Sequence, residues 1–533
     1  MTMKTKLPGL LLCALAGSGL LQAANPYLPL WEHIPDGEPY VFDDPDVKGR
    51  KRVYIYGSHD IERSAYCGRN QVVWSADIDS LDRWRYDGVI FESVSDGAGN
   101  FLRGDGRGDI LYAPDVTEVT APDGSKLYYL YPNTQNDGRT GQIAVSSRPD
   151  GPFKVCNWSD SDPRRCYGIL GFDPGVLTDD DGRVYGYWGF GRSHAAELDP
   201  ATMCTPLEGT EVIEDMIGGF ETDSLFRFFE ASSIRKIKDK YVLVYSRMSA
   251  PDEWGLPAVN YTLAYAYSDA PLGPWTYGGT IIDARGRDTD AEGKTIPTTT
   301  PYGNTHGSIL QIGPQWYVFY HRQTGLDEYA RQAMVSPIEV TVEEGPGGKV
   351  TISEAELTSE GFELNGLDPR RRHAAGIASV TMGPEPVKHE YPLNVYSGPW
   401  FEPFYLYGKS IADPYAEDIN VGRVVNCTDG STVGWKYFNF DLLPDARNPK
   451  LLLGLIPQGI DGTIEIYTDA PWKGKANPVG SIALRADMAA DPVVLTAPLK
   501  FKKPLSGRVP LYLVFSSPEK GKSMATLETI AFE

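Results

Sequence analysis

Apolar strands alternate with short polar turns over the first 340 residues of the chain. Five times an apolar strand leads through a turn into an aromatic strand. The turns carry Gly, Asp or Pro, the residues that favour tight reversals of the backbone. The pattern therefore predicts one β unit that is repeated five times. The five aromatic strands are VYIY at 53–56, LYYLY at 127–131, VYGYW at 184–188, YVLVY at 241–245 and WYVFY at 316–320.

A third strand follows each aromatic strand, and two of the units end in similar tails, PDGPF at 149–153 and APLGPW at 270–275. Strands repeat and no amphipathic helix is evident. Radial blades explain this better than a tandem of sandwiches or the much shorter rungs of a β-helix. The sequence predicts an all-β fold in which residues 25–340 form a five-bladed β-propeller.

The repeat stops after residue 340. Residues 341–387 contain the turn sequence GPGG and the basic run RRR, and we expect a connecting β segment there. Short alternating strands return over residues 388–533, where they predict a β-sandwich.

Three carboxylates occupy comparable positions at blade starts. Asp36 lies in HIPDGEPYVF, Asp173 in GFDPGVL and Glu230 in FFEASSI. Residues that enter the innermost strands of different blades can converge on the central channel. Glu230 follows two phenylalanines, whose apolar surroundings would keep an acid protonated near neutral pH. Together the three acids could supply a base, a proton donor and a group that tunes the pKa of the donor.

The composition limits the class of partner. The chain has 71 Asp and Glu against 50 Lys and Arg, a formal charge of −21. This balance argues against nucleic acid or an anionic membrane surface as a partner. The 31 Tyr and 11 Trp would suit both stacking on sugars and a large β core.

The N-terminal segment has the features of an export signal. Lys4 and Lys6 precede an apolar run that ends at Leu21, and small residues follow it. The run is too short to span a membrane, so residues 1–24 are predicted to be the signal peptide of a secreted or periplasmic protein. Five cysteines follow, of which Cys156 and Cys166 could form a bridge across a loop.

The motifs, taken in blade order, resemble glycoside hydrolase family 43, five-bladed propellers that cleave arabinose, xylose or galactose units with inversion. The resemblance covers roughly residues 25–340 and implies a role for each acid. Asp36 corresponds to the general base, Asp173 to the acid that tunes the pKa of the donor, and Glu230 to the general acid. Inversion predicts that the carboxyl groups of Asp36 and Glu230 lie about 6.5–9.5 Å apart. The motifs are HIPDGE at 33–38, APDV at 113–116, FDPGV at 172–176, EAS at 230–232, and THGS at 305–308 leading into YHR at 320–322.

Three other acids compete with or accompany this set. Glu38 shares a strand face with Asp36 and could be mistaken for the base. Glu221 competes with Glu230, although no strand follows it. Asp115 in the APDV motif could contact the substrate or hold the structure.

The resemblance also places His306 on the propeller axis. There it could help to bind a structural calcium ion through water, or it could be a channel histidine satisfied by hydrogen bonds. No cofactor is required for the chemistry. Arg322 could contact a sugar hydroxyl, hold a catalytic carboxylate or form a structural salt bridge. The aromatic candidates for the sugar pocket are Trp31, Tyr112, Trp188 and Phe229.

Three segments of the C-terminal part, STVGWKYFNFDLLP, GTIEIYTDAP and GRVPLYLVFSS, resemble family 6 carbohydrate-binding modules. Such a module would hold the enzyme on polysaccharide and raise its local concentration there. The alternative is a sandwich that only supports the propeller. Trp400, Trp435 and Trp472 are candidates for a sugar platform, and Trp435 could instead belong to the core.

The sequence thus predicts a secreted, inverting exo-glycosidase. An α-L-arabinofuranosidase that trims plant polysaccharide side chains is the first expectation. A β-xylosidase or an exo-β-galactosidase of the same fold is the alternative within this chemistry. A sugar-binding propeller without catalysis is the alternative of another class, and the presence of all three acids argues against it. The oligomeric state is not indicated.

Overall fold

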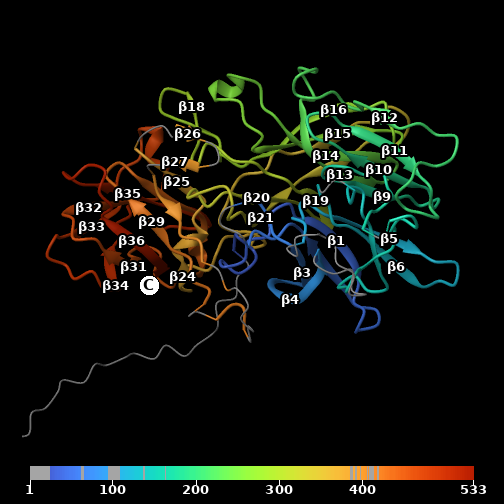
Figure 1. The fold of residues 1–533 in the computed structure, drawn as a ribbon. Coiled ribbons are helices and arrows are strands. Elements are labelled where there is room, and N and C mark those ends of the chain that lie inside the picture. Colours follow the sequence, from blue (N-terminus) through green and yellow to red (C-terminus); the bar gives the residue numbers. More distant parts are fainter. Residues whose placement is uncertain are drawn as a thin grey trace, which may run out of the picture.

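The computed structural model shows a chain built almost entirely of β-strands (Figure 1). The predicted signal peptide lies outside the described residues, apart from Ala24. No helix within the described part of the chain is long and apolar enough to cross a membrane. The described residues are 24–61, 65–93, 108–135, 138–162, 164–384, 388–390, 393–395, 398–404, 406, 413–416 and 419–533.

Five antiparallel sheets in the N-terminal part form the predicted five-bladed propeller, and each blade takes its strands in consecutive order. Blade I is β1 (Glu38–Asp43), β2 (Lys51–Tyr56), β3 (Asn70–Asp77) and β4 (Ser80–Glu92). Blade II is β5 (Asp115–Thr120), β6 (Lys126–Tyr131), β7 (Ala144–Ser146) and β8 (Lys154–Val155). Blade III is β9 (Gly175–Thr178), β10 (Val184–Trp188), β11 (His194–Leu198) and β12 (Ile213–Glu214). Blade IV is β13 (Phe228–Ile237), β14 (Lys240–Arg247), β15 (Thr262–Ser268) and β16 (Thr276–Asp283), and blade V is β19 (Ser308–Ile312), β20 (Gln315–Arg322) and β21 (Gln332–Ile338).

The second strand of each blade is largely buried, which explains its aromatic and aliphatic sequence. In β2, Val53 and Ile55 pack toward blade V, whereas Tyr54 and Tyr56 pack toward blade II. Successive side chains of a strand point to opposite faces of the sheet, so each such strand contributes to two cores. These apolar layers between neighbouring blades are the main packing of the propeller.

The layer between blades I and V closes the ring. Trp74 of β3 lies in one core with Phe319 of β20 and Val335 of β21. Segments from the two ends of the propeller sequence are therefore packed together, which closes the ring between the first and last blades. After blade V the chain forms a two-stranded ribbon, β22 (Val340–Val342) and β23 (Val350–Ile352), whose apolar side chains pack on the core of blades IV and V.

Two further sheets pack face to face as a β-sandwich in the C-terminal part (orange and red in Figure 1). One sheet has the order β28 (Trp400–Phe401), β29 (Val424–Cys427), β36 (Ala525–Phe532), β31 (Lys450–Pro457) and β34 (Val493–Pro498), with β24 (His373–Ala374) also on β36. The other has the order β25 (Val380–Met382), β30 (Thr432–Asn439), β35 (Arg508–Ser516), β32 (Gly462–Tyr467) and β33 (Gly480–Leu484). The sandwich begins before residue 388. Strands β24 and β25 both precede that residue, and Ala375 and Ile377, which lie between them, belong to the sandwich core.

The sandwich is fixed to the propeller through buried polar contacts. Arg322 of β20 donates hydrogen bonds of 2.6 Å to the carbonyl oxygens of Gly376 and Ala378, and its guanidinium lies 3.6 Å from the ring centre of Phe401. Trp472 donates a 2.9 Å hydrogen bond to Asp288, which lies between blades IV and V. Trp435 is fully buried in the sandwich core. Two of the three tryptophans proposed as a sugar platform therefore have structural roles.

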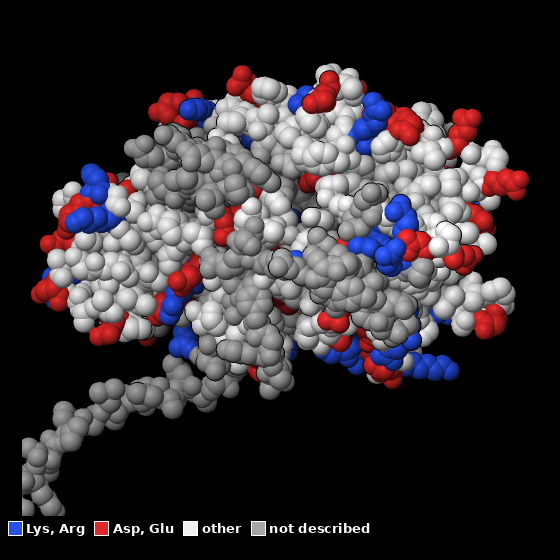
Figure 2. All heavy atoms as spheres, viewed as in Figure 1, with Lys and Arg blue, Asp and Glu red and all other residues white. Residues whose placement is uncertain are grey.

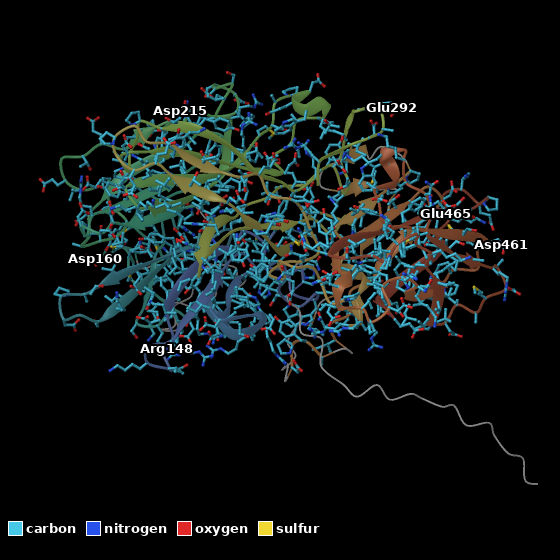
Figure 3. The ribbon with its side chains drawn as sticks, turned by 180° about the vertical axis from the view of Figure 1, so that it is seen from behind. Arg148, Asp160, Asp215, Glu292, Asp461 and Glu465 are labelled. Carbon is cyan, nitrogen blue, oxygen red and sulfur yellow. The ribbon has the colours of Figure 1, made fainter. Side chains whose placement is uncertain are left out.

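Charged side chains lie mostly on the outer surface. Acidic and basic groups are interspersed around the visible periphery (Figure 2), and Arg148, Asp160 and Glu292 mark the outer edge when the molecule is seen from behind (Figure 3). The Cys156–Cys166 bridge that the sequence left open does not form. Both are free thiols, and so are Cys67, Cys204 and Cys427.

Candidate active site

A cavity of about 640 Å³ lies where the inner strands of the propeller begin, and all three predicted catalytic acids line it. Asp36 precedes β1, Asp173 precedes β9 and Glu230 lies at the start of β13. Both aspartates have left-handed backbone conformations, with φ of 60° and 49°. Such conformations are uncommon for residues other than glycine and often occur at functional sites.

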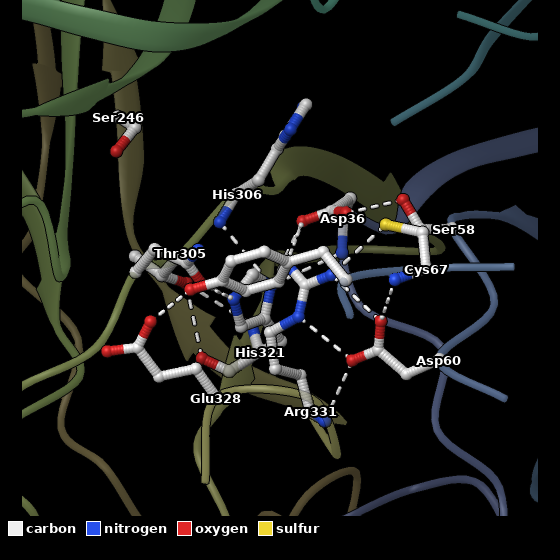
Figure 4. A network of polar contacts seen from close by, with 12 residues as sticks. Asp36, Ser58, Asp60, Cys67, Ser246, Thr305, His306, His321, Glu328 and Arg331 are labelled. Atoms are coloured by element: carbon white, nitrogen blue, oxygen red, sulfur yellow. Dashed lines mark hydrogen bonds and ion pairs between the residues drawn. The ribbon is translucent and has the colours of Figure 1, made fainter. Parts of the chain in front are cut away.

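Asp36 is held as a carboxylate by donors on several sides (Figure 4). Ser58 donates a 2.5 Å hydrogen bond to Oδ2, and Nη1 of Arg331 lies 3.3 Å from Oδ1. Nδ1 of His321 accepts the backbone N–H of Asp36 at 3.2 Å. Burial raises the pKa of Asp36, but Arg331 and, more weakly, His321, His306 and Ser58 bring it below its usual value. An acid that stays ionised is suited to act as a general base.

Arg331 connects Asp36 to a second carboxylate, Asp60. Its Nε and Nη2 atoms each lie 2.9 Å from an oxygen of Asp60. A bidentate pair of this kind fixes the plane of the guanidinium as well as its position. The remaining Nη1 is thereby aimed at Asp36. Nη2 also contacts the sulfur of Cys67 at 3.3 Å, on the cavity wall.

A β-bulge aims Glu230 into the cavity. Glu230 pairs with Ser246 of β14, and the register shifts on both sides of this pair. The next residue, Ala231, has a left-handed φ of 72°. A bulge inserts one residue and redirects a side chain that would otherwise follow the regular alternation of the strand.

Glu230 is protonated at neutral pH in this environment. Desolvation is the largest cause and the charge of Asp36 the next, and together they raise its pKa to about 8 against the opposing effects of Arg331 and Asn260. Asp173 also has a strongly raised pKa, because it is buried and faces Glu230 and Asp36. Asn133 donates a 2.8 Å hydrogen bond to Asp173. One cavity thus holds an ionised acid opposite two acids that retain their protons.

His306 lies between Asp173, which lines the cavity, and Glu38, which lies outside the lining. Its Nδ1 is 3.7 Å from Asp173, and its Nε2 is 3.9 Å from Glu38. Burial lowers the pKa of His306 to about 4, so the ring is neutral at physiological pH. Within the described residues, no three His, Cys, Asp or Glu side chains gather closely enough to hold a metal ion. A calcium ion here would need mostly water ligands, and it stays a prediction.

The two alternative acids of the first and second blades belong to the framework. Glu38 lies outside the cavity lining and forms a 2.8 Å ion pair with Arg235. Asp115 accepts a 2.6 Å hydrogen bond from Tyr40 of blade I and another from the backbone of Val176 in blade III. These contacts tie four inner strands together, β1, β5, β9 and β13. The third alternative, Glu221, is exposed and also lies outside the cavity lining.

The predicted sugar-binding residues divide into two groups. Tyr112 and Phe229 line the cavity, whereas Trp31, Asp115, Trp188 and Arg322 do not. Trp31 packs against Trp74, and its indole donates a 2.9 Å hydrogen bond to the carbonyl of Pro414. Trp188 stacks on His194 in the core between blades II and III. Sequence proximity to a motif does not fix the face to which a strand residue points.

Several lining residues escaped the sequence analysis. They lie at strand ends or in loops, and none belongs to a motif of carboxylates. Arg331 directly precedes β21, so its position at the start of a blade V strand was a usable signal. Asn133, which binds Asp173 but does not line the cavity, follows the end of β6 in the same way. Other lining residues that the sequence motifs did not indicate include Tyr66, Asn260 and Glu328.

Comparison with known proteins gives a consistent result. The model of the family described as Glycosyl hydrolases family 43 matches residues 40–346. A "Xylosidase/arabinosidase" of Thermoclostridium stercorarium is 35% identical over 475 residues, which cover 85% of this chain and 89% of the relative. An "Arabinoxylan arabinofuranohydrolase" of Paenibacillus polymyxa is 27% identical, covering 70% of this chain and 60% of the relative.

Among solved structures, a family 43 arabinoxylan arabinofuranohydrolase from Bacillus subtilis, in complex with cellotetraose, aligns with 96% of this chain and 97% of its own. Its sequence identity is 18% and its TM-score 0.46.

Proposed function

Because the chain belongs to glycosyl hydrolases family 43, we propose that it is an exo-acting α-L-arabinofuranosidase that removes arabinose side chains from plant polysaccharide. Membership makes the chain a glycoside hydrolase, and the family in general inverts the anomeric centre. Support for the sugar comes from the relatives, which are named for arabinose-releasing and xylose-releasing activities. The observation that carries the chemistry is the opposite direction of the pKa shifts of Asp36 and Glu230 in one cavity.

The proposed reaction uses these two acids on opposite sides of the anomeric carbon. Asp36 accepts a proton from a water molecule, and the water oxygen forms a bond to the anomeric carbon. The bond from that carbon to the glycosidic oxygen breaks with its electron pair on the oxygen, which takes the proton of Glu230. The products are the free sugar with inverted configuration and the shortened glycan. Asp36 ends protonated and Glu230 ionised, and exchange with solvent restores both.

Asp173 is the group that tunes Glu230 in this scheme. Its own pKa is strongly raised by burial and by the charges of Glu230 and Asp36, so Asp173 stays protonated and places no second negative charge beside Glu230 when the acid has given up its proton. Asn133 fixes the position of Asp173 through the amide hydrogen bond. Asp173 is therefore a positioning and tuning group rather than a proton donor to the substrate.

A β-xylosidase is the second candidate, because a curated relative carries both activities in its name. The test compares hydrolysis of 4-nitrophenyl α-L-arabinofuranoside, β-D-xylopyranoside and β-D-galactopyranoside by the wild-type protein and by Glu230→Ala. We expect the arabinofuranoside to have the highest kcat/KM and the variant to lose at least a hundredfold of it. A preference for the xyloside would transfer the assignment to the second candidate. Equal activity of the variant would remove Glu230 from the mechanism.

A further inference from the structure

The rim of the cavity beside Glu230 carries an unusual group of aromatic side chains. Phe172 and Phe229 immediately precede Asp173 and Glu230, and Phe190 lies between them on the turn from β10 to β11. The ring centres of Phe172 and Phe190 are 5.0 Å apart, and those of Phe190 and Phe229 are also 5.0 Å apart. All three line the cavity.

Phe190 is 56% exposed although its ring packs against the rings of Phe172 and Phe229. Leaving a ring this size in water forgoes stabilisation that a buried position would provide. Single exposed apolar residues are common on protein surfaces, so exposure alone does not make a site. The feature that distinguishes Phe190 is the way its turn is held at the cavity rim.

The turn is attached on both sides of Phe190 to the backbone of the active site. Gly189 donates a 2.8 Å hydrogen bond to the carbonyl of Phe172, and Gly191 donates a 2.6 Å hydrogen bond to the carbonyl of Phe229. Both glycines have positive φ, 144° and 68°. A Cβ atom on Gly189 would lie 1.9 Å from the carbonyl oxygen of Arg192. The backbone therefore allows no side chain at Gly189 and presents Phe190 in a fixed position.

The position of Phe190 near Glu230 places it on the side of the cavity where the leaving group of the substrate would lie. A general acid contacts the glycosidic oxygen, so the leaving group extends past Glu230 toward the rim. The base, Asp36, belongs to blade I, away from this aromatic group. A ring that is packed on one side and open on the other suits the apolar face of a sugar.

We propose that Phe190, supported by Phe172 and Phe229, is the stacking platform for the sugar unit of the leaving group. The platform selects the glycan chain to which the cleaved sugar is attached. This inference rests on the proposed function, because Glu230 must be the acid for this rim to face the leaving group. A pentopyranose unit of a β-1,4-linked xylan backbone, which has flat and weakly polar faces, is the ligand class that the platform fits.

The test separates the leaving group from the cleaved sugar. The ratio of kcat/KM for an arabinofuranosylated xylotriose to kcat/KM for methyl α-L-arabinofuranoside is measured in the wild type and in Phe190→Ala. We expect the ratio to fall about tenfold in the variant and to recover in Phe190→Trp. Leu225→Ala is the control, because Leu225 is a similarly exposed apolar residue, 51% accessible, outside the cavity lining.

A second measurement does not depend on the identity of the cleaved sugar. Calorimetric binding of xylobiose, the leaving-group fragment, should weaken about tenfold in Phe190→Ala and remain as in the wild type in Leu225→Ala. An equal affinity in wild type and Phe190→Ala, or no measurable binding by the wild type, would overturn the platform. Failure of the wild type to cleave any arabinofuranoside, with xylobiose binding lost in Phe190→Ala, would overturn the proposed function and leave the platform standing.

Discussion

Nη1 of Arg331 lies 3.3 Å from Oδ1 of Asp36, while the other side of the same guanidinium is bound by Asp60. The base of the reaction therefore depends on a cation that is itself held by a buried acid. This arrangement crosses the closure of the propeller, since Asp36 and Asp60 belong to blade I and Arg331 to blade V (Figure 4). Ring closure and the charge state of the base are thus linked.

Replacing Arg331 should move the pH profile as well as reduce the rate. Arg331 lowers the pKa of both Asp36 and Glu230. In Arg331→Gln both limbs of the kcat/KM profile should therefore shift upward, by about one pH unit. Arg331→Lys keeps the positive charge and should shift them less. A large loss of rate with both limbs in their wild-type positions would mean that Arg331 acts only through contact with the substrate.

The alkaline limb of the wild-type profile should report Glu230. The protonated form is the active one, so kcat/KM should be constant in the neutral range and fall above about pH 8. The acid limb should lie low, because the pKa of Asp36 is reduced. The measurement is kcat/KM from pH 4 to pH 10 in a buffer series of constant ionic strength. An alkaline limb near pH 5 would contradict the environment described for Glu230.

The raised pKa of Glu230 also predicts a cost in stability. Between its unfolded pKa of 4.5 and its folded pKa of about 8 the folded state binds more protons than the unfolded state. Stability therefore falls as the pH rises through this window. Glu230→Gln cannot ionise and should be more stable than the wild type at pH 9 by about 1–2 kcal/mol, with little difference at pH 4.

Urea unfolding at the two pH values checks this prediction. Glu221→Gln is the matched control, because Glu221 is exposed and outside the cavity. It should change the free energy of unfolding by less than about 0.5 kcal/mol at either pH. If the free energy of unfolding of Glu230→Gln depends on pH as it does in the wild type, the carboxyl group of Glu230 is not desolvated in the folded protein.

Arg322 should matter for the attachment of the sandwich rather than for the chemistry. It is 3% exposed, and Arg322→Ala would leave two carbonyl oxygens without their donor and remove the packing on Phe401. The expected cost is about 2–4 kcal/mol of folding free energy. At temperatures where the variant is folded, its pH profile should keep both wild-type limbs. Arg164→Ala, which removes an arginine that is 77% exposed in its side chain, should leave the melting temperature within about 1 °C.

The fold could be predicted because its signal is repeated and local. The strands with both faces buried carry runs such as VYIY and YVLVY, and the turns between strands carry Gly and Asp. The three acids could be found because each precedes or opens an inner strand in its own blade. The sandwich core could not be bounded as well, since Ala375 and Ile377 lie in a short apolar stretch without strand periodicity.

Most of the site residues that could not be predicted from the sequence were missed because the direction of their side chains could not be predicted. His321 and Arg322 are neighbours in β20, yet His321 faces Asp36 whereas Arg322 faces the sandwich. Successive strand residues point to opposite sides, and a shift of one residue reverses the assignment. Phe190 and Arg331 lie in turns or at strand ends, where no periodicity marks them. Their contacts depend on segments distant in the sequence, which only the folded chain brings together.

The leaving-group dependence of two variants tests the central assignment most directly. Hydrolysis of 2,4-dinitrophenyl and 4-methylphenyl glycosides of the same sugar is compared in the wild type, Glu230→Gln and Asp36→Asn. An activated leaving group needs no proton, so Glu230→Gln should retain far more activity on the dinitrophenyl glycoside than on the methylphenyl glycoside. Asp36→Asn should lose at least about a hundredfold on both, because attack by water is impaired in each case. A Glu230→Gln protein equally impaired on the two substrates, or an Asp36→Asn protein that recovers on the activated one, would contradict the account.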